Sequence, residues 1–177
     1  MRILFIGTPQ YSIPVLEALL DAGHDVVGVI TQPDKPIGRS RQSQESPVKR
    51  FALDRELTVL QPTSLRPQKV VEGIRSLAPD VVALAAYGKI LPAELLALTP
   101  EGALNLHPSL LPRHRGPSPV ATAILEGDEV TGVTLMQMDE GMDTGPVLAQ
   151  QEEPILPEDT TETLTWRLFN LGAALFV

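Results

Sequence analysis

Residues 1–30, MRILFIGTPQYSIPVLEALLDAGHDVVGVI, decide the fold. Ile3–Ile6 is a short apolar run typical of a buried strand, and Gly7-Thr8-Pro9 breaks it before apolar residues recur at helical spacing. Gly23 marks the end of that helix, and Val26–Ile30 forms a second apolar run. A strand, a helix and a strand in this order form a βαβ unit with parallel strands and a right-handed crossover. The sequence therefore predicts an α/β fold.

The remaining chain continues this alternation and then departs from it. We expect further strands at Leu57–Leu60, Asp80–Tyr87 and Ala103–Leu106, and helices at Ser46–Ala52, Pro67–Leu77, Pro92–Leu98, Pro117–Leu125 and Thr160–Phe176. Asp80–Tyr87 is almost continuously apolar, which indicates a central strand with both faces covered. Val130–Met138 and Pro146–Ile155 instead alternate apolar and polar residues, which is typical of an antiparallel hairpin. The expected architecture is a mostly parallel twisted sheet with helices on both faces and this hairpin at one side, near the carboxy end.

The composition favours one compact domain. The chain has 177 residues, 43% of them hydrophobic, which is enough for one substantial core and too few for two ordinary domains. It has no cysteines, so disulfides, thiolate metal ligands and a cysteine nucleophile are excluded. No signal peptide or apolar run of membrane-spanning length is recognisable, so we expect an intracellular protein that does not contact a membrane. The net charge of -8 opposes broad binding to phosphate backbones.

A basic segment interrupts this acidic chain. Thr31–Pro47 lacks apolar periodicity and is expected to be a loop. Between Asp34 and Arg50, five basic residues stand against two acidic ones. Such a segment is either a solvated surface loop or an arm that contacts phosphates.

The stretch Asn105–Gly116, NLHPSLLPRHRG, is the main candidate for chemistry. A His-Pro pair alone is equally typical of a rigid surface loop. Here, however, Asn105 and His107 come where a buried strand ends, and a later acidic loop, Asp139–Gly145, adds carboxylates. An amide donor, an imidazole base and a carboxylate suit acyl transfer without a covalent enzyme intermediate. Ser109 lacks a Gly-x-Ser-x-Gly context, and the three histidines lack metal-ligand spacing on one helix, so a serine hydrolase and a metal site are both disfavoured.

Two separated motifs together resemble a known enzyme family. Asn105-Leu106-His107-Pro108-Ser109-Leu110-Leu111-Pro112 with Arg115-Gly116, and Asp139-x-Gly-x-Asp143-Thr144-Gly145, are similar to the catalytic core of enzymes that transfer formyl groups from 10-formyltetrahydrofolate. Within that superfamily, Phe5–Pro9 and the basic segment from Thr31 to Lys49 are similar to methionyl-tRNA formyltransferases. The resemblance runs over essentially the whole chain. It implies a Rossmann-like catalytic domain at residues 1–177, formyl transfer to the amino group of initiator methionyl-tRNA, and no metal.

The resemblance also implies roles for individual residues. Asn105 is expected to polarise the formyl oxygen, His107 to act as the base toward the methionyl amine, and Asp143 to position and support His107. The folate is expected to contact the family motif at Ser109, Leu110, Leu111 and Pro112, and to lie between walls formed by Tyr87, Gly88, Ile90 and Leu91 on one side and Gln137 and Asp139 on the other. Lys35, Arg39, Arg41 and Lys49 are the expected tRNA contacts.

Two alternatives remain open. A similar domain that formylates an amino sugar would fit the core motifs, but would carry no basic insertion after the second strand. A folate-binding or tRNA-binding module without catalytic activity would also fit. Because Val177 lies inside a helical pattern, we expect a fragment that lacks the barrel-like carboxy-terminal domain of the family. We further expect a monomer in the cytoplasm, or in an organelle that initiates translation with formylmethionine.

Overall fold

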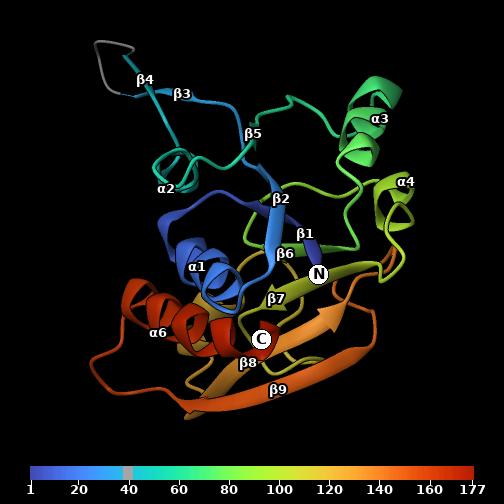
Figure 1. Cartoon of the computed structure of the whole chain (residues 1–177). Coiled ribbons are helices and arrows are strands. Elements are labelled where there is room, and N and C mark those ends of the chain that lie inside the picture. Colours follow the sequence, from blue (N-terminus) through green and yellow to red (C-terminus); the bar gives the residue numbers. More distant parts are fainter. Residues whose placement is uncertain (38–41) are drawn as a thin grey trace.

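The computed structural model describes residues 1–37 and 42–177. Its centre is a seven-stranded sheet in the order β5-β2-β1-β6-β7-β8-β9 (Figure 1). The strands are β1 (Arg2–Gly7), β2 (Asp25–Ile30), β5 (Val59–Leu60), β6 (Val81–Ala85), β7 (Ala103–His107), β8 (Val130–Gln137) and β9 (Val147–Pro154). The first five strands in the order are parallel, whereas β8 and β9 are antiparallel to their neighbours. The predicted central strand β6 and the predicted hairpin at one side of the sheet are both confirmed.

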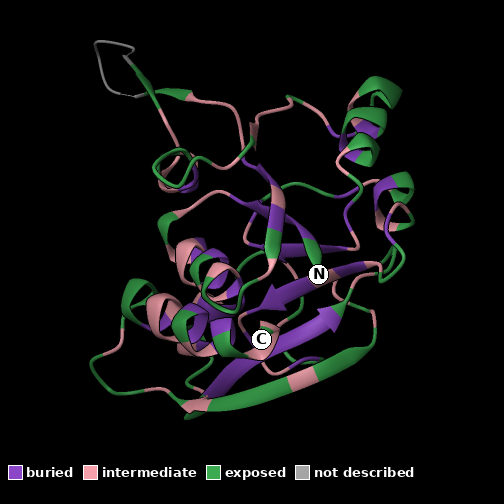
Figure 2. Ribbon diagram, in the orientation of Figure 1, coloured by how far each residue is buried: buried purple, intermediate pink, exposed green. Residues whose placement is uncertain are grey.

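Helices cover both faces of this sheet, as predicted. They are α1 (Ile13–Asp21), α2 (Pro47–Leu53), α3 (Gln68–Ser76), α4 (Ala93–Leu96), α5 (Pro119–Leu125) and α6 (Thr161–Ala173), with short 3-10 turns at η1 (Gln10–Ser12) and η2 (Ala174–Phe176). A first core lies between the sheet and α1, α2 and α6, and a second core lies between the opposite face and α3 and α4. Figure 2 shows the buried residues concentrated along the central strands, while β9 is largely exposed.

The alternation of side chains along a strand explains why the central strands are apolar throughout. On β1, Ile3 and Phe5 enter the first core, whereas Leu4 and Ile6 enter the second. The side chains of β6 divide between the two cores in the same way. Because both faces are covered, neither strand has positions that favour polar residues.

α6 approaches the sheet closely because Gly172 has no side chain. A Cβ atom at this position would lie 2.6 Å from Cδ2 of Leu106 and 2.8 Å from Cγ2 of Val133. Phe169, one turn earlier on α6, is buried in the first core. The glycine therefore allows α6 to rest directly on β7 and β8, beside the ends of the parallel strands.

The basic segment forms a small ribbon that the sequence does not predict. β3 (Lys35–Ile37) pairs antiparallel with β4 (Gln42–Gln44), so the expectation of an irregular loop over Thr31–Pro47 is wrong for these residues. Figure 1 shows the ribbon projecting from the body above α2. Both of its stems are tied to α2, because Nζ of Lys49 lies 2.7 Å from Asp34 and 3.0 Å from Glu45. The ribbon is therefore anchored at its base.

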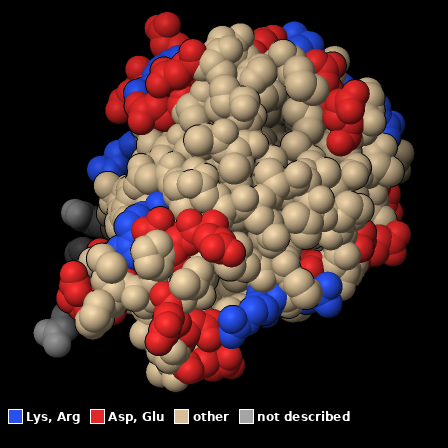
Figure 3. Space-filling view, turned by 90° about the horizontal axis from the view of Figure 1, so that it is seen from below, with Lys and Arg blue, Asp and Glu red and all other residues tan. Residues whose placement is uncertain are grey.

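Charge is distributed unevenly over the surface. Seen from below, the centre of the surface is formed by uncharged residues, and both acidic and basic residues lie around its margins (Figure 3). This face therefore offers little attraction to a polyanion. Among the described residues, no helix has both the length and the apolar character needed to cross a bilayer.

Candidate active site

A cleft of about 580 Å³ lies at the carboxyl ends of β1, β6 and β7, and we call it the central cleft. The strand order changes direction between β1 and β6, and ligands of open α/β sheets bind at such a position. Val120 of α5 and Phe169 of α6 contribute to the opposite wall. Among the described residues that line the cleft there is no Asp or Glu, and Lys35 contributes a positive charge. The cleft thus suits a neutral or anionic ligand on an otherwise acidic protein.

Asn105 and His107 lie together in this cleft, as predicted. They are two residues apart on β7, so their side chains leave the same face of the sheet. Both residues are buried, with 8% and 5% of their surfaces exposed, and both line the cleft. Within the described part of the chain, the side-chain amide of Asn105 has no hydrogen-bond partner. Its N–H groups are therefore available to a ligand oxygen.

The ring of His107 is held by a main-chain carbonyl. Nε2 of His107 lies 3.0 Å from the carbonyl oxygen of His114. A carbonyl oxygen can only accept a hydrogen bond, so Nε2 must carry a proton and donate it. In the neutral ring, Nδ1 is then the unprotonated nitrogen and can act as the base.

Asp143 lies beside that free nitrogen. Its Oδ2 is 3.6 Å from Nδ1 of His107, which is close enough for an ion pair and too long for a hydrogen bond. The same oxygen accepts a hydrogen bond of 2.8 Å from the backbone N–H of Gly116. The backbone of Asp143 is left-handed, with φ of 53°, which is uncommon for a residue other than glycine. The carboxylate of Asp143 is therefore held beside one ring nitrogen of His107 without a hydrogen bond to it, while the carbonyl of His114 contacts the other.

Asp139, predicted to contact folate, shapes the acidic loop. Its Oδ1 accepts hydrogen bonds from the backbone N–H of Gly141 at 3.0 Å and from Oγ1 of Thr144 at 2.7 Å. These contacts close the turn that contains Asp143. Asp139 remains exposed, so the turn leaves its carboxylate accessible.

The loop from Ser109 to Pro112 packs against the antiparallel hairpin and does not line the central cleft. Ser109 is fully buried, and its Oγ donates to the carbonyl of Arg113 at 2.7 Å. Oγ1 of Thr134 donates to the carbonyl of Ser109 and accepts from the N–H of Leu111. Leu110 lies against Gly132, and Pro112 is exposed. In this structure the loop fixes the position of the segment that follows it.

The predicted folate walls are only partly brought together. Gly88 and Tyr87 line the central cleft. Tyr87, however, is almost fully buried, with 2% of its surface exposed, and it belongs to the second core. Burial raises the pKa of its phenol. Ile90 is 83% exposed, and Leu91 is buried in the second core. Gln137 pairs with Leu104 near the start of β7, whereas His107 ends that strand, so the structure does not bring Gln137 to the cleft.

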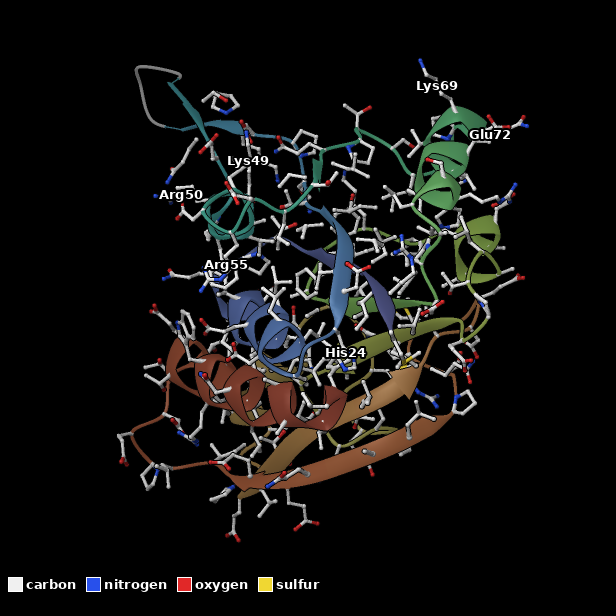
Figure 4. The ribbon with its side chains drawn as sticks, viewed as in Figure 1. His24, Lys49, Arg50, Arg55, Lys69 and Glu72 are labelled. Atoms are coloured by element: carbon white, nitrogen blue, oxygen red, sulfur yellow. The ribbon has the colours of Figure 1, made fainter. Side chains whose placement is uncertain are left out.

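The predicted tRNA contacts have different surroundings. Lys35 is exposed at the base of the ribbon and lines the central cleft. Lys49 is already paired with Asp34 and Glu45, and its pKa is raised by its hydrogen bonds to these two carboxylates. Figure 4 shows Lys49 at the base of the ribbon and the neighbouring Arg50 on the outer side of α2. Arg39 and Arg41 lie outside the described residues.

Two groups at the site were missed by the sequence analysis, and both belong to the main chain. They are the carbonyl of His114, which accepts from His107, and the N–H of Gly116, which donates to Asp143. Every non-proline residue carries both groups, so side-chain patterns gave no signal. Their role depends on how residues 114–116 turn back toward β7, with positive φ at both His114 and Gly116.

One group of side chains in the described chain has atoms placed so that they can ligate a cation. His114, Glu126 and Asp128 offer ligand atoms that lie within 4.8 Å of one another. In this structure Nε2 of His114 instead contacts Oδ2 of Asp128 at 2.6 Å, and Arg113 contacts the other oxygen at 2.7 Å. The carboxylate of Asp128 is thus satisfied by protein groups.

The whole chain, residues 1–177, matches the sequence profile of the formyl transferase family. It is 54% identical over 177 residues to the methionyl-tRNA formyltransferase of Chloroflexus aggregans and 50% identical to that of Marinobacter nauticus. These alignments cover 100% of this chain and 57% of each relative, so the chain spans little more than half their length.

Solved structures of formyltransferases share the fold. The phosphoribosylglycinamide formyltransferase of Bacillus halodurans superposes with a TM-score of 0.83 at 28% identity, covering 99% of this chain and 91% of that one. A sugar 3N-formyl transferase superposes with a TM-score of 0.70 at 22% identity, covering 99% of this chain and 60% of that one, and shows the fold alone. Since the family profile spans every residue and a structure of the same kind overlays nearly the whole chain, this chain belongs to the formyl transferase family.

Proposed function

We propose that this chain transfers a formyl group from 10-formyltetrahydrofolate to the α-amino group of initiator methionyl-tRNA. One observation carries the proposal. His107 lines a cleft, with its Nε2 committed to the carbonyl of His114 and its Nδ1 beside Asp143. Two residues away lies the amide of Asn105, which has no hydrogen-bond partner among the described residues. The methionyl-tRNA formyltransferases at 54% and 50% identity support the choice of acceptor.

Each residue of this set has a distinct task. The folate supplies an activated formyl group, whose carbon forms a bond to the attacking amine nitrogen. Asn105 donates a hydrogen bond to the formyl oxygen, which gains negative charge as the carbon becomes tetrahedral. His107 accepts the proton that the amine loses, at Nδ1, and this proton is then available to the folate nitrogen as the bond from carbon to that nitrogen breaks. The products are the formylated amine and tetrahydrofolate.

Asp143 stabilises the charged form of His107 in this scheme. Once Nδ1 is protonated, the imidazolium and the carboxylate of Asp143 form an ion pair across the 3.6 Å separation. Opposite charges at this separation attract each other, and the attraction is stronger near a protein than in bulk water. Because the hydrogen bond from Gly116 already fixes the carboxylate, little reorganisation is needed when the proton arrives.

The lining of the central cleft fits an aminoacyl end attached to an anionic polymer. Tyr11, Val120 and Phe169 offer apolar surface to a methionyl side chain. Lys35 stands at the base of the basic ribbon, where it can attract a phosphate, and no acidic side chain among the described lining residues opposes that contact. We assign the contacts with the rest of the tRNA to this ribbon and to Arg39 and Arg41, which lie outside the described residues, and a secondary role to Lys49.

We assign the pterin of the folate to the side of His107 that Asp143 occupies, between Gly88 and Ile90 and the loop that contains Asp139. The exposed Ile90 and the accessible loop support this choice. Ser109, Leu110, Leu111 and Pro112 would then act mainly by fixing the loop below the folate. No metal is required by any of these steps.

We further propose that residues 1–177 form the catalytic domain, and that the additional length of the relatives corresponds to the barrel-like domain of the family. The bacterial relatives favour a cytoplasmic reaction. The arrangement of one cleft within one chain is compatible with a monomer.

A comparison of amine acceptors tests the proposed function. The chain is incubated with 10-formyltetrahydrofolate and, in separate reactions, with methionyl-tRNA, phosphoribosylglycinamide or an amino-sugar nucleotide. We expect a low rate of transfer, with methionyl-tRNA formylated faster than the other two acceptors. Preferential formylation of the amino sugar would support the alternative of a domain that formylates amino sugars, in which the basic ribbon has no role. Folate binding without transfer to any acceptor would support a non-catalytic module.

A further inference from the structure

His114 connects the candidate base to a second, buried pair of side chains. The carbonyl of His114 accepts the hydrogen bond from His107, and the side chain of His114 points to Asp128, with 2.6 Å between Nε2 and Oδ2. Both of these side chains are largely buried, with 8% and 11% of their surfaces exposed. The carboxylate of Asp128 is therefore the anchor of the backbone that orients the base.

The main chain also holds Asp128 in place. Asp128 lies three residues after the end of α5, and its backbone N–H donates to the carbonyl of Ala123 at 3.0 Å. The hydrogen bond from His114 holds the pKa of the Asp128 carboxyl below its usual range, and Arg113 acts in the same direction although burial opposes it. The carboxylate is thus ionised at neutral pH and accepts from both residues.

The backbone of His114 shows what the anchor does. This residue has φ of 53°, a left-handed conformation that is strained for a residue with a side chain. Without the contact to Asp128, the backbone could relax out of this conformation. The carbonyl of His114 would then turn away from Nε2 of His107, and the imidazole would be free to place its proton on either nitrogen.

We propose that His114 and Asp128 are positioning residues that fix the tautomer of His107. Their contact keeps the carbonyl of His114 against Nε2, so that the neutral ring carries its proton there and Nδ1 stays free beside Asp143. This inference rests on the proposed role of His107 as the base. Neither residue touches the reacting groups, and both act through the main chain.

The tautomer of His107 can be read directly by NMR. In the 15N-labelled wild-type chain, the ring nitrogens of His107 should show one neutral form, with the proton on Nε2. Asp128→Ala and His114→Phe should each give a mixture of the two tautomers. Asp128→Asn keeps an oxygen that accepts from His114 and should retain most of the wild-type form. Glu126 lies 3.9 Å from the other nitrogen of His114 and is exposed, so Glu126→Ala is the matched control and should leave the spectrum unchanged.

Transfer kinetics provide the second measurement. Asp128→Ala and His114→Phe should lower kcat roughly tenfold to a hundredfold, because a displaced catalytic group loses its alignment. The dissociation constant for tetrahydrofolate should change less than twofold, since neither residue is placed at the folate. Arg113→Ala should have a smaller effect, because it leaves the contact between His114 and Asp128 in place.

The two proposals fail in different ways. A single Nε2-protonated form in folded Asp128→Ala and His114→Phe would overturn the positioning role, whatever the activity. Should Asp128→Ala not fold, His114→Phe and Asp128→Asn decide the question by the same spectrum. If instead the tautomers mix and His107 proves dispensable for transfer, the proposed base is wrong while the positioning relationship stands.

Discussion

The carboxylate of Asp143 lies 3.6 Å from Nδ1 of His107 and is fixed there by the backbone N–H of Gly116. The other ring nitrogen of His107 is committed to the carbonyl of His114. Residues 114–116 therefore hold both members of the pair, and the side-chain set proposed for catalysis depends on this short stretch of main chain. In the proposed mechanism, Asp143 acts through its charge.

Replacement of Asp143 should separate charge from shape. Asp143→Asn preserves the size of the side chain and an oxygen for the Gly116 N–H, but removes the negative charge beside Nδ1. We expect kcat to fall about a hundredfold or more, because the imidazolium loses its partner, while tetrahydrofolate affinity changes little. Single-turnover transfer and equilibrium folate binding measure the two quantities. Equal losses in rate and in folate affinity would point instead to a folate contact.

Asn105→Ala should remove a donor to the formyl oxygen. The loss of one such donor typically costs about a hundredfold to a thousandfold in kcat. Since the Asn105 amide has no hydrogen-bond partner among the described residues, folding should be little affected. Thermal unfolding measured beside transfer rates checks both expectations. A strongly lowered Tm would show that Asn105 is needed for the fold.

The sequence predicts the parallel half of the sheet well because apolar runs such as Asp80–Tyr87 are covered on both faces. It does not predict the ribbon of β3 and β4, whose residues Lys35, Pro36, Ser43 and Gln44 are exposed and show no apolar alternation. Gln137 lies at the carboxyl end of β8. Because β8 runs antiparallel to β7, this end lies beside the start of β7, away from the cleft at the carboxyl end of β7. The sequence predicts Asn105 and His107 as candidate site residues, and both line the central cleft, but the orientation of the imidazole depends on main-chain contacts.

The lysines of the basic segment should differ in their effect on tRNA binding. Lys35→Ala removes an exposed charge at the cleft and should lower the slope of log affinity against log salt by about one unit. Lys49→Ala should change the slope less, because Asp34 and Glu45 already pair with Lys49. The double change Arg39→Ala and Arg41→Ala tests the part of the segment outside the described residues. Titrations at several salt concentrations, with folate affinity as the control, give these slopes; unchanged slopes in all variants would remove the ribbon from the tRNA interface.

The free energy of unfolding should depend on pH through Asp159, which pairs with Arg167 of α6. Its carboxylate is 3% exposed and contacts Arg167 at 2.6 Å, and the hydrogen bond from Arg167 holds the pKa of Asp159 far below its usual range. A carboxyl with a lowered folded-state pKa adds stability that is fully present above its unfolded pKa of about 3.9 and is lost as the pH falls toward the folded value. We expect Asp159→Asn to lower the free energy of unfolding by about 2 kcal/mol at pH 7.

Unfolding measured at several pH values tests the direction of this effect. The difference between wild type and Asp159→Asn in urea unfolding should shrink as the pH is lowered below about 4. Asp25→Asn is the matched control, because Asp25 pairs with Arg2 while 62% of its side chain is exposed. Such a surface pair contributes about 0 to 1 kcal/mol, so its removal should have little effect at any pH. A difference for Asp159→Asn that grows on acidification would contradict the assignment.

The role of His107 as the base in formyl transfer is tested most directly by a single-turnover measurement. Wild-type chain and His107→Ala are each mixed at saturating concentration with 10-formyltetrahydrofolate and methionyl-tRNA, and formylmethionyl-tRNA is quantified over time. We predict transfer by the wild type and a rate about a hundredfold to ten-thousandfold lower for His107→Ala, with tetrahydrofolate binding retained. Transfer by His107→Ala at the wild-type rate would contradict the account.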